Sequence, residues 1–232
     1  MPALGRQDDE PASRRGVVLA WSGGKDSALS LWALRERGVA VGALLTTITE
    51  GTGRVSMHGV RRELVVGQAA AAGLPLVEMA VPRWPSNAVY ERRLAGALAA
   101  EPLGSMVELA FGDLHLEDIR AYREDRLAGI GKRARFPLWG RPTAQLARDF
   151  IAAGFEATLV CVDPTRLDGS FAGRRFDASL LADLPGDVDP CGEGGEFHTF
   201  VHDGPVFDRP LAVRPGSMVA QDGFVFCELL AG

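Results

Sequence analysis

The residues of this chain that can do chemistry gather in two glycine-rich stretches. The first is the loop Ser22-Gly23-Gly24-Lys25-Asp26-Ser27, which follows the apolar run 17–20 and precedes the mostly apolar segment 28–34. That order is typical of a strand, a tight turn and a helix. The N–H groups of such a loop and of the helix N-terminus point to one place and bind anions. Ser22 and Ser27 add hydroxyl groups and Lys25 adds a positive charge, so we expect a phosphate or pyrophosphate site.

The loop differs from a Walker A motif, which is the commonest phosphate loop of this kind. That motif needs a glycine five positions before the glycine of its Gly-Lys pair, and Ser or Thr directly after the lysine. Here Leu19 and Asp26 occupy those two positions. A Gly-Gly turn that only caps a core helix is the alternative interpretation.

The second stretch, Asp189 to Thr199, contains three glycines, the carboxylates Glu193 and Glu196, and His198. Glycines leave room for a ligand or another backbone segment. Glu193 and Glu196 are candidates for metal binding, for holding an amine or for general base catalysis, and His198 is a candidate proton carrier. A glycine-rich turn with solvated carboxylates before a strand is the competing interpretation.

The elements that position these residues alternate between strands and helices. Apolar runs predict strands at 16–21, 39–48, 76–81 and 106–111, and helical spacing predicts helices at 27–37, 60–71, from about 87, and at 116–130. This alternation predicts an α/β, Rossmann-like parallel sheet with helices on both faces. Ligands of such sheets bind beyond the carboxyl ends of the strands. The loop, Thr46, Gly112 and Asp113 all follow or end a strand, so we expect them to share one crevice.

The pattern becomes less regular after residues 131–135, which we interpret as a domain junction. We predict a polar N-terminal tail at 1–15, a nucleotide-binding domain at 16–131 and a smaller α+β domain at 132–232. The second domain contains a predicted helix at 143–153, a strand at 156–162, a short helix at 177–183 and β-like segments between 211 and 229.

Composition excludes several classes of protein. The chain has 232 residues and a formal net charge of −5, and its basic residues form no runs, which disfavours nucleic-acid binding. Its three cysteines form no Cys-x-x-Cys pair, so a disulfide framework and a zinc knuckle are not expected. No secretory signal and no apolar run near the ~20 residues of a membrane span is visible. We therefore expect a cytoplasmic protein without membrane contact, and the sequence leaves homo-oligomerisation open.

The loop Ser22 to Ser27 resembles the PP-loop of the ATP pyrophosphatases. Further motifs follow it in order: Ser56-Met57-His58, Gly112-Asp113, Pro137-Leu138-Trp139, Gly154-Phe155-x-Ala157, Cys191-Gly192-Glu193-x-Gly195-Glu196-Phe197-His198-Thr199 and Asp203-Gly204-Pro205-x-Phe207. Together they resemble the diphthine–ammonia ligase family of PP-loop ATPases. The resemblance implies cleavage of ATP between the α and β phosphates and adenylation of a diphthine-like carboxylate acceptor. This acceptor is expected to be a small molecule or a modified protein side chain. Ammonia then displaces AMP and leaves an amide.

Within that mechanism the first motif serves the nucleotide. We expect Lys25, the loop hydroxyls and the loop amides of Gly23 and Gly24 to stabilise the pyrophosphate leaving group. Asp26 is a candidate Mg²⁺ ligand beside the phosphates, or alternatively a residue that stabilises the first helical turn. Thr46, His58 and Gly112 are candidate nucleotide contacts, although a structural role for His58 is equally plausible on these grounds.

The remaining candidates serve the acceptor and ammonia. Asp113 is predicted to bind Mg²⁺ or the attacking amine, with a helix N-cap as the alternative. Glu193 and Glu196 are predicted to capture and deprotonate ammonium. Two other functions stay open: a PP-loop enzyme that thiolates tRNA, and a module that binds adenine nucleotide without turnover.

Overall fold

The computed structural model describes residues 16–232, and its larger layer is a six-stranded sheet. The parallel strands lie in the order β4-β2-β1-β5-β6, and the short β3 pairs antiparallel with the end of β2. The strands are β1 (Val17–Ala20), β2 (Val41–Thr49), β3 (Arg54–Val55), β4 (Leu76–Val81), β5 (Glu108–Ala110) and β6 (Arg133–Arg135). The predicted α/β architecture is therefore confirmed. The tail expected at residues 1–15 lies outside the described part of the chain.

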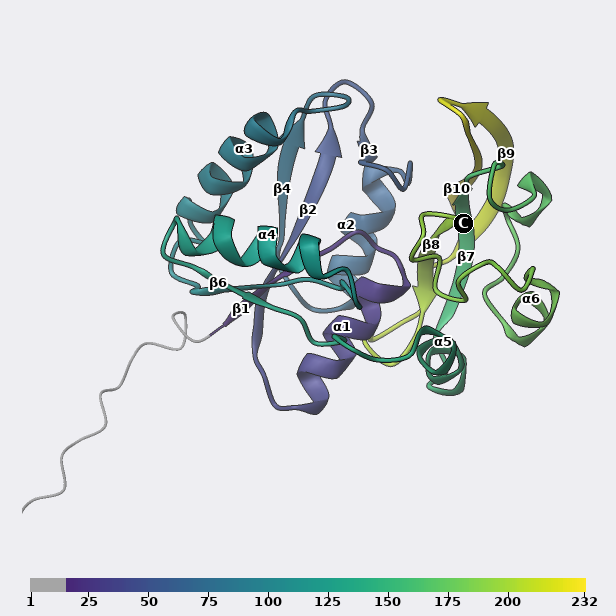
Figure 1. The fold of residues 1–232 in the computed structure, drawn as a ribbon, viewed down its shortest axis with the longest axis horizontal. Coiled ribbons are helices and arrows are strands. Elements are labelled where there is room, and N and C mark those ends of the chain that lie inside the picture. Colours follow the sequence, from purple (N-terminus) through teal and green to yellow (C-terminus); the bar gives the residue numbers. More distant parts are fainter. Residues whose placement is uncertain (1–15) are drawn as a thin grey trace, which may run out of the picture.

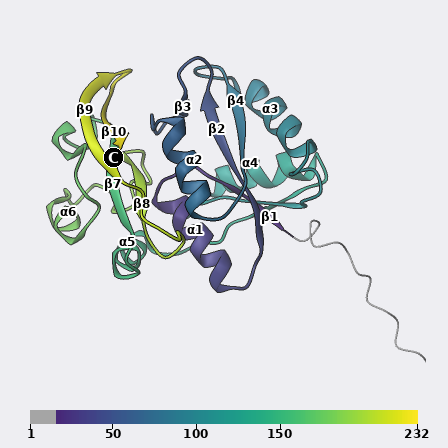
Figure 2. The same cartoon turned by 180° about the vertical axis from the view of Figure 1, so that it is seen from behind.

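Helices cover both faces of this sheet, as Figures 1 and 2 show from opposite sides. They are α1 (Lys25–Glu36), α2 (Arg62–Ala71), α3 (Asn87–Ala99) and α4 (Glu117–Ala128). Successive strand residues point to opposite faces. Accordingly, Leu44 of β2 belongs to the core cluster of α1 and α2, whereas the adjacent Leu45 belongs to the cluster of α3 and α4. Both clusters are apolar, so burial on both faces holds the sheet.

The strand order reverses between β1 and β5. From β1 the chain passes through α1 to β2 on one side, and it later returns to pair β5 with the other edge of β1. Such a switch point leaves a crevice beyond the carboxyl ends of the two strands, where α/β proteins bind ligands. The glycine loop follows β1 and Gly112-Asp113 follows β5. The fold therefore brings these two segments to the same edge.

A second, antiparallel sheet has the strand order β8-β7-β10-β9 and lies beside the first in Figure 1. Its strands are β7 (Glu156–Val162), β8 (Phe197–Asp203), β9 (Val213–Gln221) and β10 (Phe224–Ala231), and its helices are α5 (Thr143–Ala152) and α6 (Ala178–Asp183). This sheet confirms the predicted α+β character of the C-terminal part. The strands β9 and β10 form a hairpin around Asp222-Gly223, as the turn residues predict.

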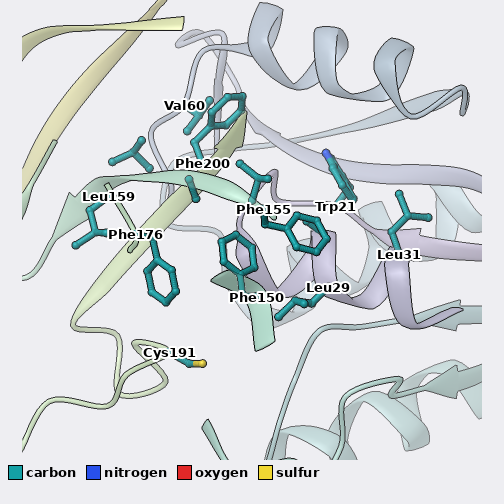
Figure 3. Packing of buried hydrophobic residues seen from close by; sticks show 14 of the residues in the cluster. Trp21, Leu29, Leu31, Val60, Phe150, Phe155, Leu159, Phe176, Cys191 and Phe200 are labelled. Carbon is teal, nitrogen blue, oxygen red and sulfur yellow. The ribbon is translucent and has the colours of Figure 1, made fainter. Parts of the chain in front are cut away.

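The segment 131–135 is not a simple linker. Residues 133–135 form β6, which pairs with β5 and lies at the edge of the first sheet. The two sheets also share one core cluster, in which Trp21 and Leu31 of the first part and Phe150, Phe155 and Phe200 of the second are buried (Figure 3). The rings of Phe150 and Phe155 stack at 4.8 Å between centroids. The division into domains at residue 131 stays a proposal, because the apolar core continues across it.

Within residues 16–232, none of the helices combines the length and apolar character that a membrane crossing requires.

Candidate functional site

The glycine loop adopts a conformation that exposes backbone donors. Gly23 has a φ of +80°, which favours glycine, and α1 begins at Lys25 with no side-chain cap from Gly24. Among residues 16–232, no protein acceptor contacts the backbone N–H groups of Gly23, Asp26 and Ser27. The hydroxyl of Ser27 donates to the carbonyl of Gly24 at 2.8 Å, so it stabilises the turn. The amides at the N-terminus of α1 are thus free for an anion.

Strand β8 of the second sheet fixes the loop from the other side. The backbone N–H of Lys25 donates to Oγ1 of Thr199 at 3.0 Å, and the N–H of Val201 donates to the carbonyl of Gly23 at 2.9 Å. Gly24 lies so close that a Cβ there would meet the carbonyl oxygen of Thr199 at 3.0 Å. The loop therefore lies at the contact between the two sheets, and not on the first sheet alone.

Lys25 is buried, with 3% of its surface exposed, and its ammonium group is surrounded by acceptors. Nζ contacts the Asp26 carboxylate at 2.9 and 3.0 Å and also donates to the carbonyl of Cys191. Burial alone would lower the pKa of Lys25, but Asp26, together with Cys191 and Glu193, raises it above its ordinary value. Lys25 is thus charged at neutral pH and links the loop to the second motif.

Gln68 of α2 is a positioning residue that sequence reasoning missed. Its side chain is fully buried, accepts from Nε1 of Trp21 at 2.9 Å, and donates to the carbonyls of Gly23 and Val201. It therefore joins the start of the loop, the loop itself and β8. The only signal in the sequence is a lone amide on the apolar face of a predicted helix.

We predict that Gln68→Ala destabilises the protein by about 2–4 kcal/mol, because it leaves one buried donor and two buried acceptors without this partner. Urea denaturation with a fixed m-value measures this loss. Gln145→Ala, at an exposed position of α5, is the control and should change stability by less than about 0.5 kcal/mol. Equal effects of the two substitutions would contradict this role of Gln68.

The second motif forms a tight turn against Lys25. The Asp189 carboxylate accepts from the hydroxyl of Thr143 at 2.7 Å and from the N–H of Cys191 at 2.7 Å. Glu196 is 6% exposed; one of its carboxylate oxygens accepts from the N–H of Asp189 at 3.4 Å, and Oε2 has no partner among the described residues. A buried carboxylate oxygen without a donor is costly, so it favours a ligand that can donate hydrogen bonds.

Glu193 lies in the same turn and is surrounded by negative groups. Burial raises the pKa of its carboxyl to about 7, with further increases from Asp26, Asp189 and Asp113, and Lys25 opposes them. Half of the Glu193 side chains are thus neutral near pH 7. A carboxylate with this pKa is suited to accept a proton at neutral pH.

We predict that the side-chain carboxyl carbon of Glu193 titrates with a midpoint near pH 7 in ¹³C NMR spectra, with the signal assigned by its absence in Glu193→Gln. Because the folded pKa lies above the unfolded value, ionisation opposes folding. The contribution of Glu193 to the free energy of unfolding therefore falls as the pH rises from about 4.5 to about 7. A midpoint near 4.5 would contradict the buried environment of Glu193.

Gly112 and Asp113 follow β5, and their contacts differ: Gly112 packs against α1, whereas Asp113 forms an ion pair. Gly112 touches the N-terminus of α1, since a Cβ there would lie 3.0 Å from Cβ of Asp26. This close packing explains why a residue without a side chain occupies position 112. Asp113 does not cap a helix, because α4 begins at Glu117 with Leu116 at its N-cap; instead it pairs with Nε of Arg123 at 2.8 Å.

Two histidines from distant segments meet beside the loop. His58 and His198 lie 4.5 Å apart between ring centroids, and a Cβ on Gly24 would meet Cε1 of His58 at 3.0 Å. Burial lowers the pKa of His58 to about 4 and that of His198 to about 3, and Lys25 adds to both effects. Both rings are therefore neutral at pH 7. Nucleotide contact by His58 stays a prediction, and the structure adds the contact of its ring with His198, at 33° between the ring planes.

Thr46 and a metal site remain the least supported candidates. Thr46 is buried, and its hydroxyl has no partner among residues 16–232. In the same range, no three His, Cys, Asp or Glu side chains are arranged to hold a metal ion. Nucleotide contact by Thr46 and Mg²⁺ binding by Asp26 stay predictions.

The fold and the loop together define a Rossmann-like α/β protein with a turn of free backbone N–H groups at its switch point. Sequence comparison identifies the family. A model of the diphthamide synthase N-terminal domain matches residues 15–131, and a model of the diphthamide synthase C-terminal domain matches residues 142–228. The chain therefore belongs to the diphthamide synthase family.

Curated relatives are similar at modest identity. A diphthine–ammonia ligase of Danio rerio is 25% identical over 225 residues, which cover 85% of this chain and 86% of that protein. The enzyme of the same name from Rattus norvegicus is 30% identical over 114 residues, covering 45% of this chain and 43% of its own length. That of Schizosaccharomyces pombe is 27% identical over 119 residues, covering 48% of this chain and 20% of its own length. The matches therefore span less than half of the rat and yeast proteins.

Proposed function

We propose that this protein is an ATP-dependent ligase that adenylates a carboxylate with release of pyrophosphate, and then transfers the acyl group from AMP to ammonia. The observation that carries this proposal is the contact between the two motifs. The buried ammonium group of Lys25 lies between the free amides of the glycine loop and the carbonyl of Cys191 in the Glu193–Glu196 turn. The ammonium group of Lys25 therefore lies between the proposed phosphate site in the glycine loop and the proposed amine site in the Glu193–Glu196 turn. The diphthine–ammonia ligases similar to this chain support the same reaction class.

The residues present fit the outer phosphates of ATP. The free N–H groups of Gly23, Asp26 and Ser27 are donors for the pyrophosphate, and the charge of Lys25 compensates its negative charge. Asp26 now holds Lys25, so phosphate binding requires the lysine to exchange a carboxylate for phosphate oxygens. A Mg²⁺ ion bridging the phosphates would supply further charge compensation, and the released Asp26 carboxylate is the residue that would hold it.

Ammonia is the second substrate in this proposal. An ammonium ion has four N–H donors and one positive charge, which the orphan oxygen of Glu196 and the neighbouring Glu193 match. At pH 7 a Glu193 carboxylate can remove the proton that makes ammonium non-nucleophilic. Ammonia then attacks the carbonyl carbon of the acyl adenylate. The bond between that carbon and the phosphate oxygen breaks, and AMP leaves.

The thiolation alternative is less well supported. Cys191 is buried, its Sγ donates to the carbonyl of Thr143 at 3.3 Å, and burial raises the pKa of its thiol to about 12. Such a thiol carries almost no thiolate at neutral pH. A persulfide relay through Cys191 is therefore disfavoured.

The test of the proposal is product analysis with ATP labelled at the α or the γ phosphate, ammonium, and a panel of carboxylic acids. Labelled AMP and labelled pyrophosphate, formed together and only with an acceptor present, are the expected products. ADP and inorganic phosphate as sole products would overturn the proposal. Nucleotide binding without any cleavage across the panel would favour the non-catalytic module.

A further inference from the structure

A second cation, Arg123 of α4, lies beside the candidate site and takes no part in the proposed binding of phosphate or ammonia. It forms an ion pair with Asp113, which follows β5 at the switch point of the sheet. The preceding residue, Gly112, touches Asp26 of the glycine loop. The charge of Asp113 also contributes to the raised pKa of Glu193. The Arg123–Asp113 pair therefore lies next to both motifs of the site.

The hydrogen bonding of this pair is incomplete. Nη2 of Arg123 donates to Oδ1 of Asp113 at 3.2 Å. Nε and Oδ2 lie 2.8 Å apart but are not aligned as a hydrogen bond, and neither of these buried atoms has another partner within residues 16–232. Arginine has five N–H donors in one planar fork, so a single hydrogen bond leaves most of them available. Buried polar atoms without partners are costly and favour a ligand that satisfies them better.

Aromatic packing holds the guanidinium group of Arg123 in place. Its Cζ atom lies 4.0 Å from the centroid of the Phe111 ring, which is a cation–π contact. Phe111 is buried, and its ring stacks on that of Phe136 at 5.9 Å between centroids. The side chain of Arg123 is nevertheless 25% exposed, and that of Asp113 is 18% exposed. The cation is therefore fixed in position and still reachable from solvent.

The surroundings of Arg123 favour a ligand with a single negative charge. Its ion pair with Asp113 shows that the guanidinium fork already holds a carboxylate, and planar carboxylates match this group in geometry. Asp26, Glu193 and Asp113 add negative charge around this position. A polyphosphate is therefore repelled more strongly there than a single carboxylate.

We propose that Arg123 binds the carboxylate of the acceptor, which replaces Asp113 on the guanidinium group. The inference rests on the proposed ligase function, because a carboxylate that approaches ATP needs a cation to offset repulsion by the phosphates. Asp113 is released in this exchange, and its carboxylate adds to Glu193 as an acceptor for ammonium. The ligand class is a monocarboxylate, and Arg123 places it beside the glycine loop.

The test uses butanoate and butanamide, two probes of similar shape that differ in charge, and needs no cleavage of nucleotide. ¹⁵N NMR spectra follow the Nε–H signal of Arg123, which is assigned by its absence in Arg123→Gln. Spectra are recorded for the free protein and for the protein with excess α,β-methylene-ATP. We expect butanoate to shift this signal saturably and butanamide to leave it unchanged.

Two substitutions in the pair should change butanoate binding in opposite directions. Arg123→Gln removes the charged fork and should weaken binding at least about fivefold. Asp113→Asn removes the competing carboxylate and should strengthen binding at least about threefold. A purely structural ion pair would give no tighter binding in either variant. Arg126→Gln is the control and should stay within about twofold, because Arg126 is 49% exposed on the same helix and pairs with Asp125.

Three results would overturn the proposal: no shift of Arg123 in either state, an equal shift with butanamide, or binding that folded Asp113→Asn does not strengthen. A signal shifted by AMP or pyrophosphate and not by butanoate would also overturn it, because Arg123 would then contact the nucleotide. Butanoate binding at Arg123 without AMP formation in the product analysis would remove the ligase function and keep the carboxylate site. AMP formation without a shift at Arg123 would keep the ligase function and remove this role of Arg123.

Discussion

Lys25→Met should lower the rate of pyrophosphate release from ATP by about 10²–10³-fold, which is the usual loss when one preorganised donor to a developing charge is removed. The methionine keeps most of the side-chain volume in this buried position and removes only the charge and its three donors. ATP affinity should fall as well, because in the proposed mechanism the ammonium group contacts the phosphates before and during cleavage. Single-turnover kinetics and equilibrium binding of a non-hydrolysable ATP analogue measure the two effects separately.

Lys132→Met is the matched control for this experiment. Lys132 is the second lysine of the chain, and its ammonium group donates to the carbonyls of Leu103, Gly104 and Met106, away from the loop. Its replacement should change stability and leave the kinetics of the remaining folded protein unchanged. If Lys25→Met kept normal kinetics, the glycine loop would not be the pyrophosphate site.

Glu196→Gln should separate the two halves of the reaction. The amide has the shape of the carboxylate but neither its charge nor its basicity, so ammonium loses an acceptor that is buried and has an oxygen without a partner. We expect amide formation to fall by about 10²–10⁴-fold, the range for a lost general base. ATP binding should stay within about twofold, because the Glu196 carboxylate forms no hydrogen bond or ion pair with the loop residues among those described.

Two measurements on Glu196→Gln separate ATP binding from amide formation. Isothermal titration gives its ATP affinity, and ¹⁵N-ammonium incorporation gives its amide formation. Glu156→Gln is the control, since Glu156 lies half-exposed on β7 near Arg175 and His202. Loss of ATP binding in Glu196→Gln would show that the second motif serves the nucleotide, and the division of roles proposed above would be wrong.

Much of the fold follows from local patterns in the sequence. The strand at 76–81 and the strand at 156–162 have the predicted limits, and Ser86 accepts from the N–H of Val89 as a helix N-cap should. These features depend on residues close together in the chain, whose spacing reports the local structure directly. The glycine loop between β1 and α1 was predictable for the same reason.

The arrangement of the candidate site was less predictable, because its contacts join distant residues. Thr199 and Lys25 lie 174 residues apart, and Gln68 and Val201 lie 133 apart. No periodicity or motif spacing indicates that β8 packs on the loop, that the His58 ring contacts His198, or that Arg123 pairs with Asp113. The segment 133–135 looked like a linker because three alternating residues with two arginines carry too little apolar character to predict a strand.

The hydrogen bonds between β8 and the glycine loop constrain how genes of this family can recombine. Because the glycine loop bonds to a hydroxyl and an amide from a distant part of the chain, we expect the N-terminal part alone not to hold this loop in place. A donor fragment cut at residue 131 would leave behind Thr199 and Val201, two of its supports. Recombination between members of this family should therefore preserve both halves from one parent, or substitute the loop and its distant supports together.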